Sequence, residues 1–295
     1  MVNRLFVIGS SAGGIPALIR VLEDLPGSFP APLFVVQHFP PTSPGIARKI
    51  LSKACALRVL HPRSGDPIRP GYVYVAPPNR HLLVRKGHVA LSDGPRENLV
   101  RPSIDALFRS AALAYGAAVV GVILTGALND GTAGLVAVKN LGGIAVVQDP
   151  TEALVPSMPQ SAVDHVKVDH CCKLSQMSGL LRTLAQDVRT GPPPVHSPAH
   201  CDELLQIEDE IASGSATSDE WYRLEKLAFP TDVLCPLCRR KLVEIRDVYR
   251  SRFRCRAGHA FTTATLFAAK IDGASTYGQP LGGPDAFRTA ERTGQ

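Results

Sequence analysis

The sequence predicts an α/β fold in which a doubly wound, mostly parallel sheet carries helices on both faces. Three observations lead to that prediction. The apolar runs at residues 5–8, 33–36 and 119–124 are continuous instead of alternating, as expected for strands buried on both faces. Segments with helical spacing of apolar residues separate these runs. Each run ends abruptly in small or polar residues, which is typical of a strand that turns directly into a helix or a loop.

Strands and helices are expected to alternate along the chain. A strand at residues 4–10 leads into a helix at residues 14–25, whose apolar side chains form one stripe. The later strands are expected at 33–36, 58–60, 72–76, 119–124 and 144–147, and the later helices at 43–53, 103–115, 132–140, 159–163 and 174–188. Residues 81–84 and 89–91 flank Lys86-Gly87 and are predicted to form an inserted hairpin.

The composition is that of an ordinary soluble protein of 295 residues, with 45% hydrophobic and 20% charged residues. No apolar run approaches the roughly 18 residues of a membrane-spanning helix, and no signal segment precedes the first strand. The seven cysteines, an odd number, argue against a disulfide framework. We therefore expect a cytoplasmic protein without membrane insertion. Its net charge of +6 is spread along the chain, as on a solvated basic surface.

Four parts are predicted along the chain. Residues 1–190 form the α/β domain, and residues 191–232 start with a proline-rich linker and continue with two helices. Residues 233–271 form a small cysteine-containing module. Residues 272–295 are rich in Gly, Pro, Ser and Thr, and we expect them to be disordered.

The two helices of the second part carry recognisable signals. Thr217 and Glu220 fit a capping box at the start of the second helix. The first helix has a cluster of acidic residues that is expected to be a solvated face: Asp202, Glu203, Glu208, Asp209 and Glu210.

Three of the predicted strands lead into residues of a hydrolytic triad. Ser11, His38 and Asp130 each follow a different apolar run, and the carboxyl ends of parallel strands lie along one edge of a sheet. Each residue also has an ordinary structural interpretation. Ser11 fits a helix cap, His38 a structural histidine, and Asp130 a turn residue in Asn-Asp-Gly. Their shared position at strand ends favours a common site.

Six ordered segments carry a family resemblance. They are residues 8–14 (IGSSAGG), 36–41 (VQHFPP), 74–77 (YVAP), 101–108 (RPSIDALF), 123–131 (ILTGALNDG) and 153–159 (ALVPSMP). Together they resemble the chemotaxis protein-glutamate methylesterases, the CheB catalytic domain, over residues 3–185. This resemblance implies an esterase that removes methyl groups from receptor glutamates and that could deamidate glutamines by the same acyl-transfer chemistry.

The resemblance also implies roles for individual residues. The nucleophile is Ser11, not Ser10, with His38 as its base and Asp130 orienting the histidine. Ala12, Gly13 and Ala127 lie on the oxyanion and substrate side, where Ala127 takes the place of a methionine in the family. Gly13 and its neighbour Gly14 are expected to keep the approach open. No cofactor is implied for catalysis.

The expected partners follow from the same resemblance. They are methylated cytoplasmic helices of chemoreceptors or a related signalling protein. The chain begins at the catalytic strand, so we expect no N-terminal receiver domain. The activity is then constitutive, or it is gated by a separate regulatory partner or by the C-terminal extension.

The C-terminal module has the ligand spacing of a zinc ribbon. Cys235 and Cys238 are followed, 16 residues later, by Cys255 and His259. Three thiolates and one imidazole would fill a tetrahedral site, so the zinc is predicted to be structural. Unconnected cysteines and a redox Cys-X-X-Cys pair are the alternatives. Such an extension also resembles that of some receiver-less relatives.

Two other functions stay open from the sequence alone. A regulatory binding module with weak or no catalysis would use the same fold and recruit partners through the zinc ribbon. A nucleic-acid-binding ribbon is disfavoured, and we expect no nucleic acid as a partner, because no aromatic stacking set accompanies its basic residues. Those residues are Arg239, Arg240, Arg252, Arg254 and Arg256.

Overall fold

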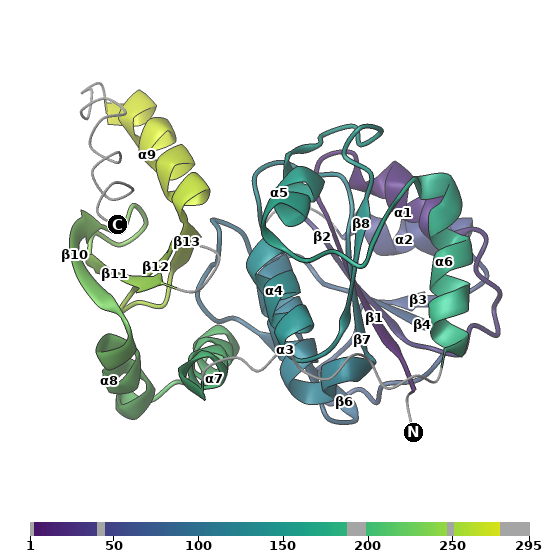
Figure 1. Ribbon diagram of the computed structural model, residues 1–295, viewed down its shortest axis with the longest axis horizontal. Helices are drawn as coiled ribbons and strands as arrows, with labels where there is room; N and C mark the ends of the chain where they lie inside the picture. Colours follow the sequence, from purple (N-terminus) through teal and green to yellow (C-terminus); the bar gives the residue numbers. More distant parts are fainter. Residues whose placement is uncertain (1–2, 40–44, 188–198, 247–250, 278–295) are drawn as a thin grey trace.

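A seven-stranded sheet runs through the larger part of the molecule (Figure 1). The structure is a computed structural model, and it describes residues 3–39, 45–187, 199–246 and 251–277. The strand order is β3-β4-β2-β1-β7-β8-β9, and every pairing in this sheet is parallel. The strands are β1 (Leu5–Ser10), β2 (Leu33–Gln37), β3 (Arg58–Leu60), β4 (Tyr72–Val75), β7 (Val119–Ile123), β8 (Ile144–Gln148) and β9 (His170–Cys172). The predicted fold class is confirmed.

Helices cover both faces of the sheet because successive strand residues point to opposite sides. Phe6 and Ile8 of β1 belong to the core beneath α1, α2 and α6, while Leu5 and Val7 belong to the core beneath α3, α4 and α5. The helices are α1 (Gly14–Leu22), α2 (Ile46–Ala54), α3 (Ile104–Tyr115), α4 (Thr132–Asn140), α5 (Ser157–His165) and α6 (Leu174–Gln186), with a 3₁₀ turn at Gly116–Ala118. Because alternate side chains of a strand enter the two different cores, the strands are apolar at successive positions.

Two elements outside this pattern complete the α/β part. The predicted hairpin is β5 (His81–Arg85) paired antiparallel with β6 (His88–Ser92). Strand β9 was not predicted from the sequence. It is a three-residue edge strand whose side chains are half-buried or exposed, so no apolar run marks it.

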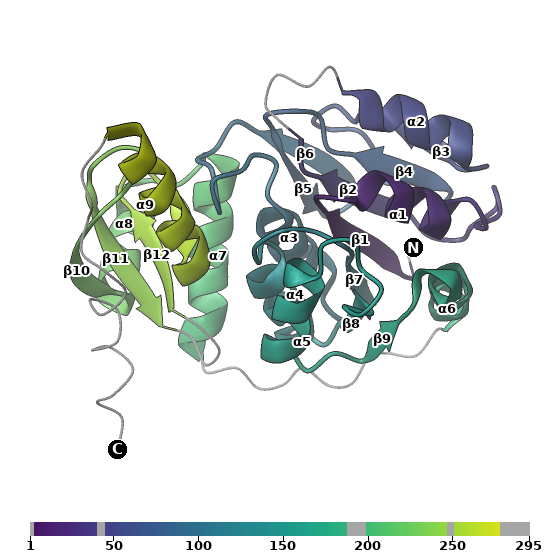
Figure 2. The same ribbon diagram turned by 90° about the horizontal axis from the view of Figure 1, so that it is seen from above.

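The C-terminal part is a four-stranded antiparallel sheet with three helices. Its strands are β10 (Phe229–Leu234), β11 (Lys241–Arg246), β12 (Ser251–Cys255) and β13 (Ala260–Thr262), in that order across the sheet. The helices are α7 (Ala199–Ser213), α8 (Ser218–Leu227) and α9 (Thr263–Tyr277). Helix α7 lies between this sheet and α3 in both views (Figure 2). The predicted capping box of Thr217 and Glu220 is present.

Two sequence-based expectations for this part are wrong. The acidic residues of α7 are not one solvated face, because Glu208 is 1% and Asp209 9% exposed, and both form ion pairs with arginines. The expected disordered tail from residue 272 is helical up to Tyr277, since α9 continues that far. The rest of that tail and the proline-rich linker at 191–198 lie outside the described residues. No helix in the described part of the chain has the length and apolar character needed to cross a bilayer.

Candidate active site

Three neighbouring strands end at one edge of the sheet and bring the predicted triad together. Strand β1 lies between β2 and β7, so the segments after these strands meet. The backbone ties them to one another: the Ser11 N–H donates to the Thr125 carbonyl at 3.0 Å, and the His38 N–H donates to the Ser10 carbonyl at 3.0 Å. From β1 the chain continues to β2 on one side and later returns to β7 on the other, so the strand order reverses at β1. Open α/β sheets bind ligands at such a topological switch point.

Ser10 and Ser11 have different environments. Ser10 is fully buried, and its hydroxyl donates to Gln37 Oε1 at 2.8 Å. Ser11 is half-buried and lines a cleft. The Gln37 side chain in turn donates to the Ser11 carbonyl at 2.8 Å, which fixes the turn between β1 and α1. The hydroxyl that faces the cleft is therefore that of Ser11.

His38 is paired with Asp130 across the cleft. The distance from His38 Nε2 to Asp130 Oδ2 is 2.9 Å, and the two side chains are only 13% and 4% exposed. A carboxylate accepts hydrogen bonds, so Nε2 carries the proton and Nδ1 keeps its lone pair. This tautomer leaves His38 Nδ1 as the basic nitrogen.

Asp130 is held by donors around α3. Its Oδ2 accepts the backbone N–H of Ile104 at 2.7 Å, and its Oδ1 accepts the Ser103 hydroxyl at 2.9 Å. The Asn98 side-chain nitrogen also donates to Oδ1, at 2.8 Å. Ser103 is the N-cap of α3, so the positive end of that helix faces the carboxylate. The position of Asp130 is thus fixed by α3 as well as by its own loop.

A second buried carboxylate lies beside Asp130. Asp105 accepts N–H groups from Gly131 and Gly134 at 2.9 and 2.7 Å. Burial and the neighbouring Asp130 charge raise the pKa of Asp105 well above its ordinary value. Burial alone would also raise the pKa of Asp130, but hydrogen bonds from His38 and other donors outweigh it and lower that pKa. Asp130 is therefore the carboxylate that stays ionised next to the histidine.

The cleft has a volume of about 270 Å³. Ser11, His38 and Asp130 all line it, and no Ser11–His38 hydrogen bond is among the contacts of the described residues. Catalytic hydrogen bonds of this kind often close only when substrate is bound. The other lining residues are Phe39, Asn98, Val100, Ala127, Leu128 and Thr265.

Of the three residues predicted for the oxyanion side, one lines this cleft and two lie in the turn that follows Ser11. Ala127 lines it, and Ala12 and Gly13 form the turn between Ser11 and α1. Gly13 has φ +77°, and a Cβ there would lie 2.8 Å from the Leu154 side chain. A Cβ on Gly14 would lie 2.0 Å from Gln37 Oε1. Both glycines therefore permit close packing within the chain, and their expected role in keeping the approach open stays a prediction.

Several residues of the site escaped sequence reasoning. Gln37, Asn98, Ser103 and Thr265 carry no motif that separates them from ordinary polar residues. Gln37 lies in the VQHFPP segment and Ser103 in the RPSIDALF segment, which both contributed to the family resemblance, whereas Asn98 and Thr265 lie in none of the six segments. Thr265 lies 135 positions beyond Asp130, so only the tertiary structure brings it to the cleft.

The four predicted metal ligands are brought together in the C-terminal part. Their ligand atoms all lie within 4.8 Å of one another, with Cys238 Sγ 3.5 Å from Cys255 Sγ, and His259 Nδ1 3.7 and 3.6 Å from the Cys235 and Cys255 sulfurs. A tetrahedral zinc ion with bonds of about 2.3 Å to sulfur and about 2.0 Å to nitrogen separates its ligand atoms by about 3.5–3.8 Å. This cluster can hold a metal ion, and it offers a complete coordination shell.

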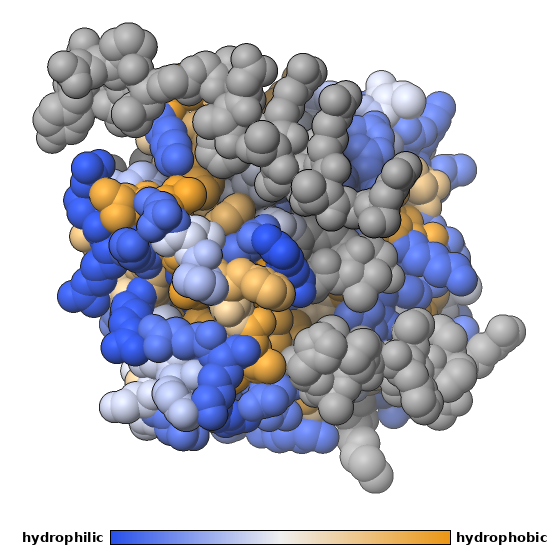
Figure 3. Space-filling view, turned by 60° about the vertical axis from the view of Figure 1, so that its left-hand side comes forward, coloured by the Kyte–Doolittle hydropathy of each residue, from blue (hydrophilic) through white to orange (hydrophobic). Residues whose placement is uncertain are grey.

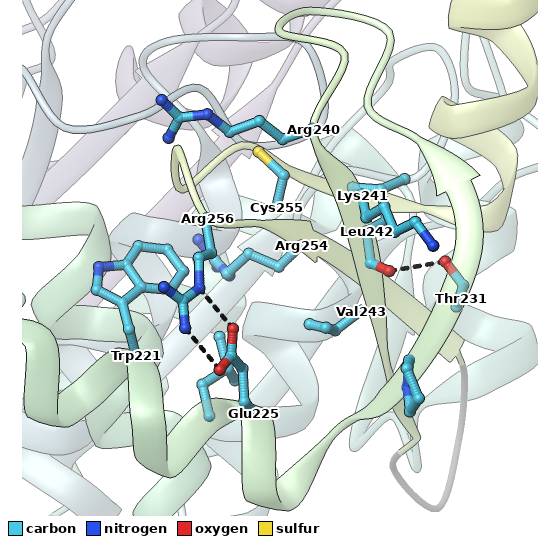
Figure 4. A pocket seen from close by; sticks show the side chains of 12 residues that line it. Trp221, Glu225, Thr231, Arg240, Lys241, Leu242, Val243, Arg254, Cys255 and Arg256 are labelled. Atoms are coloured by element: carbon cyan, nitrogen blue, oxygen red, sulfur yellow. Dashed lines mark hydrogen bonds and ion pairs between the residues drawn. The ribbon is translucent and has the colours of Figure 1, made fainter.

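A larger cavity, of about 550 Å³, lies in the same part between α8 and the sheet (Figure 4). It shares no lining residue with the Ser11 cleft, and the thiol that lines it, Cys255, is one of the predicted metal ligands. The arginines around it are largely engaged: Arg256 is doubly hydrogen-bonded to Glu225, and Arg254 is buried against carboxylates. Arg252 is also paired, with Glu208. These ion pairs weaken the nucleic-acid interpretation of the basic residues.

Comparison with protein families gives one clear match. The model of the CheB methylesterase family matches residues 6–181 of the chain. The crystal structure of the Thermotoga maritima CheB methylesterase catalytic domain superposes with a TM-score of 0.60 at 34% identity, covering 62% of this chain and all of that one.

Curated proteins with similar sequences carry related names. A Leptospira interrogans protein, provisionally named a protein-glutamate methylesterase/protein-glutamine glutaminase, is 44% identical over 61% of this chain and 94% of its own length. The Pectobacterium atrosepticum protein-glutamate methylesterase/protein-glutamine glutaminase is 41% identical over 62% of this chain. The chain spans 53% of that relative's length.

Proposed function

The chain belongs to the CheB methylesterase family, and on that premise we propose that it is a serine hydrolase that demethylates glutamate γ-methyl esters of chemoreceptors. The observation that carries this proposal is the His38–Asp130 pair in a cleft that is also lined by Ser11. Names of relatives at 41–44% identity support both the methylesterase and the glutaminase activity. No observation on the chain favours the alternative of a catalytically weak binding module.

The first half of the reaction forms an acyl-enzyme. As Ser11 Oγ attacks the ester carbonyl carbon, its proton passes to His38 Nδ1, and Asp130 stabilises the resulting imidazolium. The negative charge on the carbonyl oxygen is stabilised by backbone N–H groups at the start of α1, from Ala12 and Gly13, and Ala127 lines the same cleft. The tetrahedral intermediate then expels the methoxy group, which takes the proton from His38 and leaves as methanol.

The second half restores the enzyme. His38 removes a proton from water, the hydroxide attacks the glutamyl–Ser11 ester, and Ser11 regains its proton as the glutamate carboxylate leaves. With a glutamine side chain the leaving group is ammonia, and the same steps give the same product. Burial of Asp130 and its donors keep His38 in one tautomer through both halves.

The Cys₃His cluster is proposed to hold a structural zinc ion. Cys235, Cys238, Cys255 and His259 would bind it, and the metal would supply folding free energy to a segment with a small apolar core. Burial raises the pKa of the Cys235 and Cys255 thiols, although backbone N–H groups of Leu237 and Ala257 donate to the two sulfurs, so metal binding would have to displace their protons. The metal takes no part in the ester chemistry.

The partners and location follow as further parts of the proposal. Methylated cytoplasmic helices of a chemoreceptor are the substrate, and the enzyme acts in the cytoplasm. The surface around the cleft contacts that substrate, with the exposed Leu128 at its edge.

Methanol release from membranes that contain methylated receptors tests the activity. Ser11→Ala should lower the rate more than about 1,000-fold relative to the wild type, because the nucleophile is lost. Ser10→Ala is the matched control: it removes the neighbouring, buried hydroxyl and should stay within about tenfold of the wild type. Equal release by Ser11→Ala and wild type would remove Ser11 as nucleophile. Absence of release by the wild type with several receptors would favour the binding-module alternative.

A further inference from the structure

The metal-binding part of the chain touches the loop that supports the catalytic carboxylate. Strand β13 begins at Ala260, directly after the ligand His259. The Asn98 N–H donates to the Ala260 carbonyl at 2.8 Å, and the Ala260 N–H donates to the Arg96 carbonyl at 3.1 Å. The loop before α3 therefore adds to the edge of the four-stranded sheet as a short bridge.

Asn98 connects this edge to the active site. The Thr262 N–H, which can only donate, lies 3.2 Å from Asn98 Oδ1. The carboxamide oxygen therefore faces β13, and the nitrogen faces the buried carboxylates. It donates to Asp130 Oδ1 at 2.8 Å and to Asp105 Oδ2 at 2.7 Å. The same Thr262 N–H also donates to Thr265 Oγ1 at 2.8 Å, and together with Asp130 it favours the orientation in which the Asn98 nitrogen meets the carboxylate.

The backbone of the same loop is strained. Asn98 and Leu99 have φ of 53° and 70°, in the left-handed region that a branched side chain such as leucine rarely adopts. Such conformations persist only where surrounding contacts over-determine them, and they concentrate at functional sites. Here the contacts come from the C-terminal part, since Leu99 packs against the core that contains Cys235 and Cys255.

A second set of hydrogen bonds reaches the loop of Asp130 itself. The Thr262 hydroxyl donates to Asn129 Oδ1 at 2.8 Å, and both residues are buried. Three positions further along, Thr265 lines the cleft and lies 3.4 Å from Asn98 Oδ1. The first turn of α9 is therefore part of the wall of the cleft, and β13 contacts the loop that carries Asp130.

Buried ion pairs lock the two parts together beside this contact. Glu97, next to Asn98, pairs with Arg254 of β12 at 2.9 Å and with Arg109 of α3 at 2.7 Å. Arg254 also reaches Glu208 of α7 at 3.2 Å. All four side chains are at most 3% exposed. The position of β13 relative to α3 is therefore tightly defined.

We propose that the metal-binding module is a positioning element of the active site: metal held by Cys235, Cys238, Cys255 and His259 fixes β13, and β13 orients Asn98 so that it holds Asp130. Asn98 and Thr262 are positioning residues because they act through Asp130 and not on the substrate. This inference rests on the proposed hydrolase function, and it makes the activity depend on occupancy of the metal site.

Variants of the full-length chain test the hydrogen-bonded path. Asn98→Ala should lower kcat about 10- to 100-fold, the loss expected for one hydrogen bond to a charged group, with KM within about twofold. Thr262→Val removes the bond to Asn129 and should lower kcat about 2- to 10-fold, while Thr262→Ser restores it. Thr231→Val is the matched control, because its hydroxyl bonds only within the module, to the Leu242 carbonyl.

Metal removal tests the coupling with a readout that does not need the substrate. The chain is treated with a zinc chelator, and the rate at which a fluorophosphonate labels Ser11 is measured together with kcat and bound zinc. Both rates should fall about 10- to 100-fold, and added zinc should restore them. Circular dichroism should show that the metal-free protein keeps the secondary structure of the α/β part.

The outcomes separate the two proposals. The inference is overturned if metal-free protein and Thr262→Val keep wild-type kcat and labelling rates. It is equally overturned if only KM rises, or if Thr231→Val lowers kcat as much as Thr262→Val does. A wild-type protein that releases no methanol, yet labels at Ser11 in a zinc-dependent manner, would instead contradict the proposed substrate and leave the positioning role intact.

Discussion

The α/β part and the C-terminal part of the molecule are held together in different ways. Among the residues that the structure describes, the two core clusters on either face of the large sheet contain 25 and 24 buried residues, whereas the two clusters within the C-terminal part contain six each. The small part also leaves apolar side chains at its surface, visible as orange areas among blue ones on that side of the molecule (Figure 3). Among them are Phe229, Leu234 and Leu237.

This difference in core size shows which interactions stabilise a part of the molecule that buries few apolar side chains. Stability of the α/β part follows from area removed from water, which is non-directional and tolerant of detail. The C-terminal part instead has ion pairs with Arg252 and Arg254, contacts with Asn98 and Leu99, and the four residues proposed to bind a metal ion. These interactions are directional, so each of them is sensitive to the loss of a single group. The following experiments break or sharpen this comparison.

Removal of the charge at the centre of the interface should have the largest effect. Glu97→Gln leaves Arg109 and Arg254 buried without their common carboxylate, and should lower the free energy of unfolding by about 3–5 kcal/mol. Denaturant titration measures the change. Glu225→Gln, which breaks the exposed pair with Arg256, is the control and should change little. Similar losses in both variants would contradict the role assigned to burial.

A cavity in the large core should lower the free energy of unfolding by a comparable amount, but it should leave the metal site unaffected. Leu18→Ala removes a fully buried side chain from the cluster under α1 and should lower the free energy of unfolding by about 2–5 kcal/mol. Zinc content and affinity should stay those of the wild type, because the cavity is remote from the metal ligands. Loss of zinc together with stability would show that the two parts do not have separate sources of cohesion.

Acid should weaken the interface through Glu208. Burial alone would raise its pKa, but the charges of Arg252, Arg254 and Arg109 outweigh burial and lower it from 4.5 to about 2. Because the folded-state pKa is the lower one, the ionised group stabilises the fold fully above pH about 4.5. This contribution, on the order of 3 kcal/mol, is lost as the pH falls from about 4.5 to about 2. The free energy of unfolding against pH, for wild type and Glu208→Gln, measures it, and parallel curves would contradict it.

Loss of one helix cap in each part gives the smallest expected effects. Ser103→Ala removes the N-cap of α3 and a donor to Asp130, and should cost about 1 kcal/mol and also lower kcat. Thr217→Ala removes the N-cap of α8 and should cost a similar amount with kcat unchanged. Thermal melts and methanol release measure both. A fall in kcat for Thr217→Ala, or none for Ser103→Ala, would contradict the assignment.

Most of the α/β part could be predicted because its strands are buried on both faces. Residues 5–8, 33–36 and 119–124 are apolar throughout for that reason, and they are the strands that carry the site. Strand β9 has no such run and was missed. The acidic residues of α7 were wrongly predicted to form a solvated face. Glu208 and Asp209 pair with arginines up to 124 positions away, and no local sequence pattern reveals these pairs.

The candidate site likewise contains residues that the sequence reveals and residues that it does not. Ser11, His38 and Asp130 are recognisable because each follows a buried strand and has a residue type with known chemistry. Asn98 and Thr262 are not recognisable, because their importance comes only from the partners that they meet.

By itself the sequence determined the fold class, the candidate triad and the four metal ligands, since these depend on local periodicity, residue type and short spacing. The family resemblance favoured Ser11 over Ser10, and the tertiary structure supplied the reason, because Ser10 is buried against Gln37 and Ser11 lines the cleft. Only the tertiary structure decided that the metal-binding part closes on the loop of Asn98. Contacts between groups more than a hundred positions apart depend on how helices and strands pack after they have formed. The packing of the two parts against each other produces no periodic pattern in the sequence of either one.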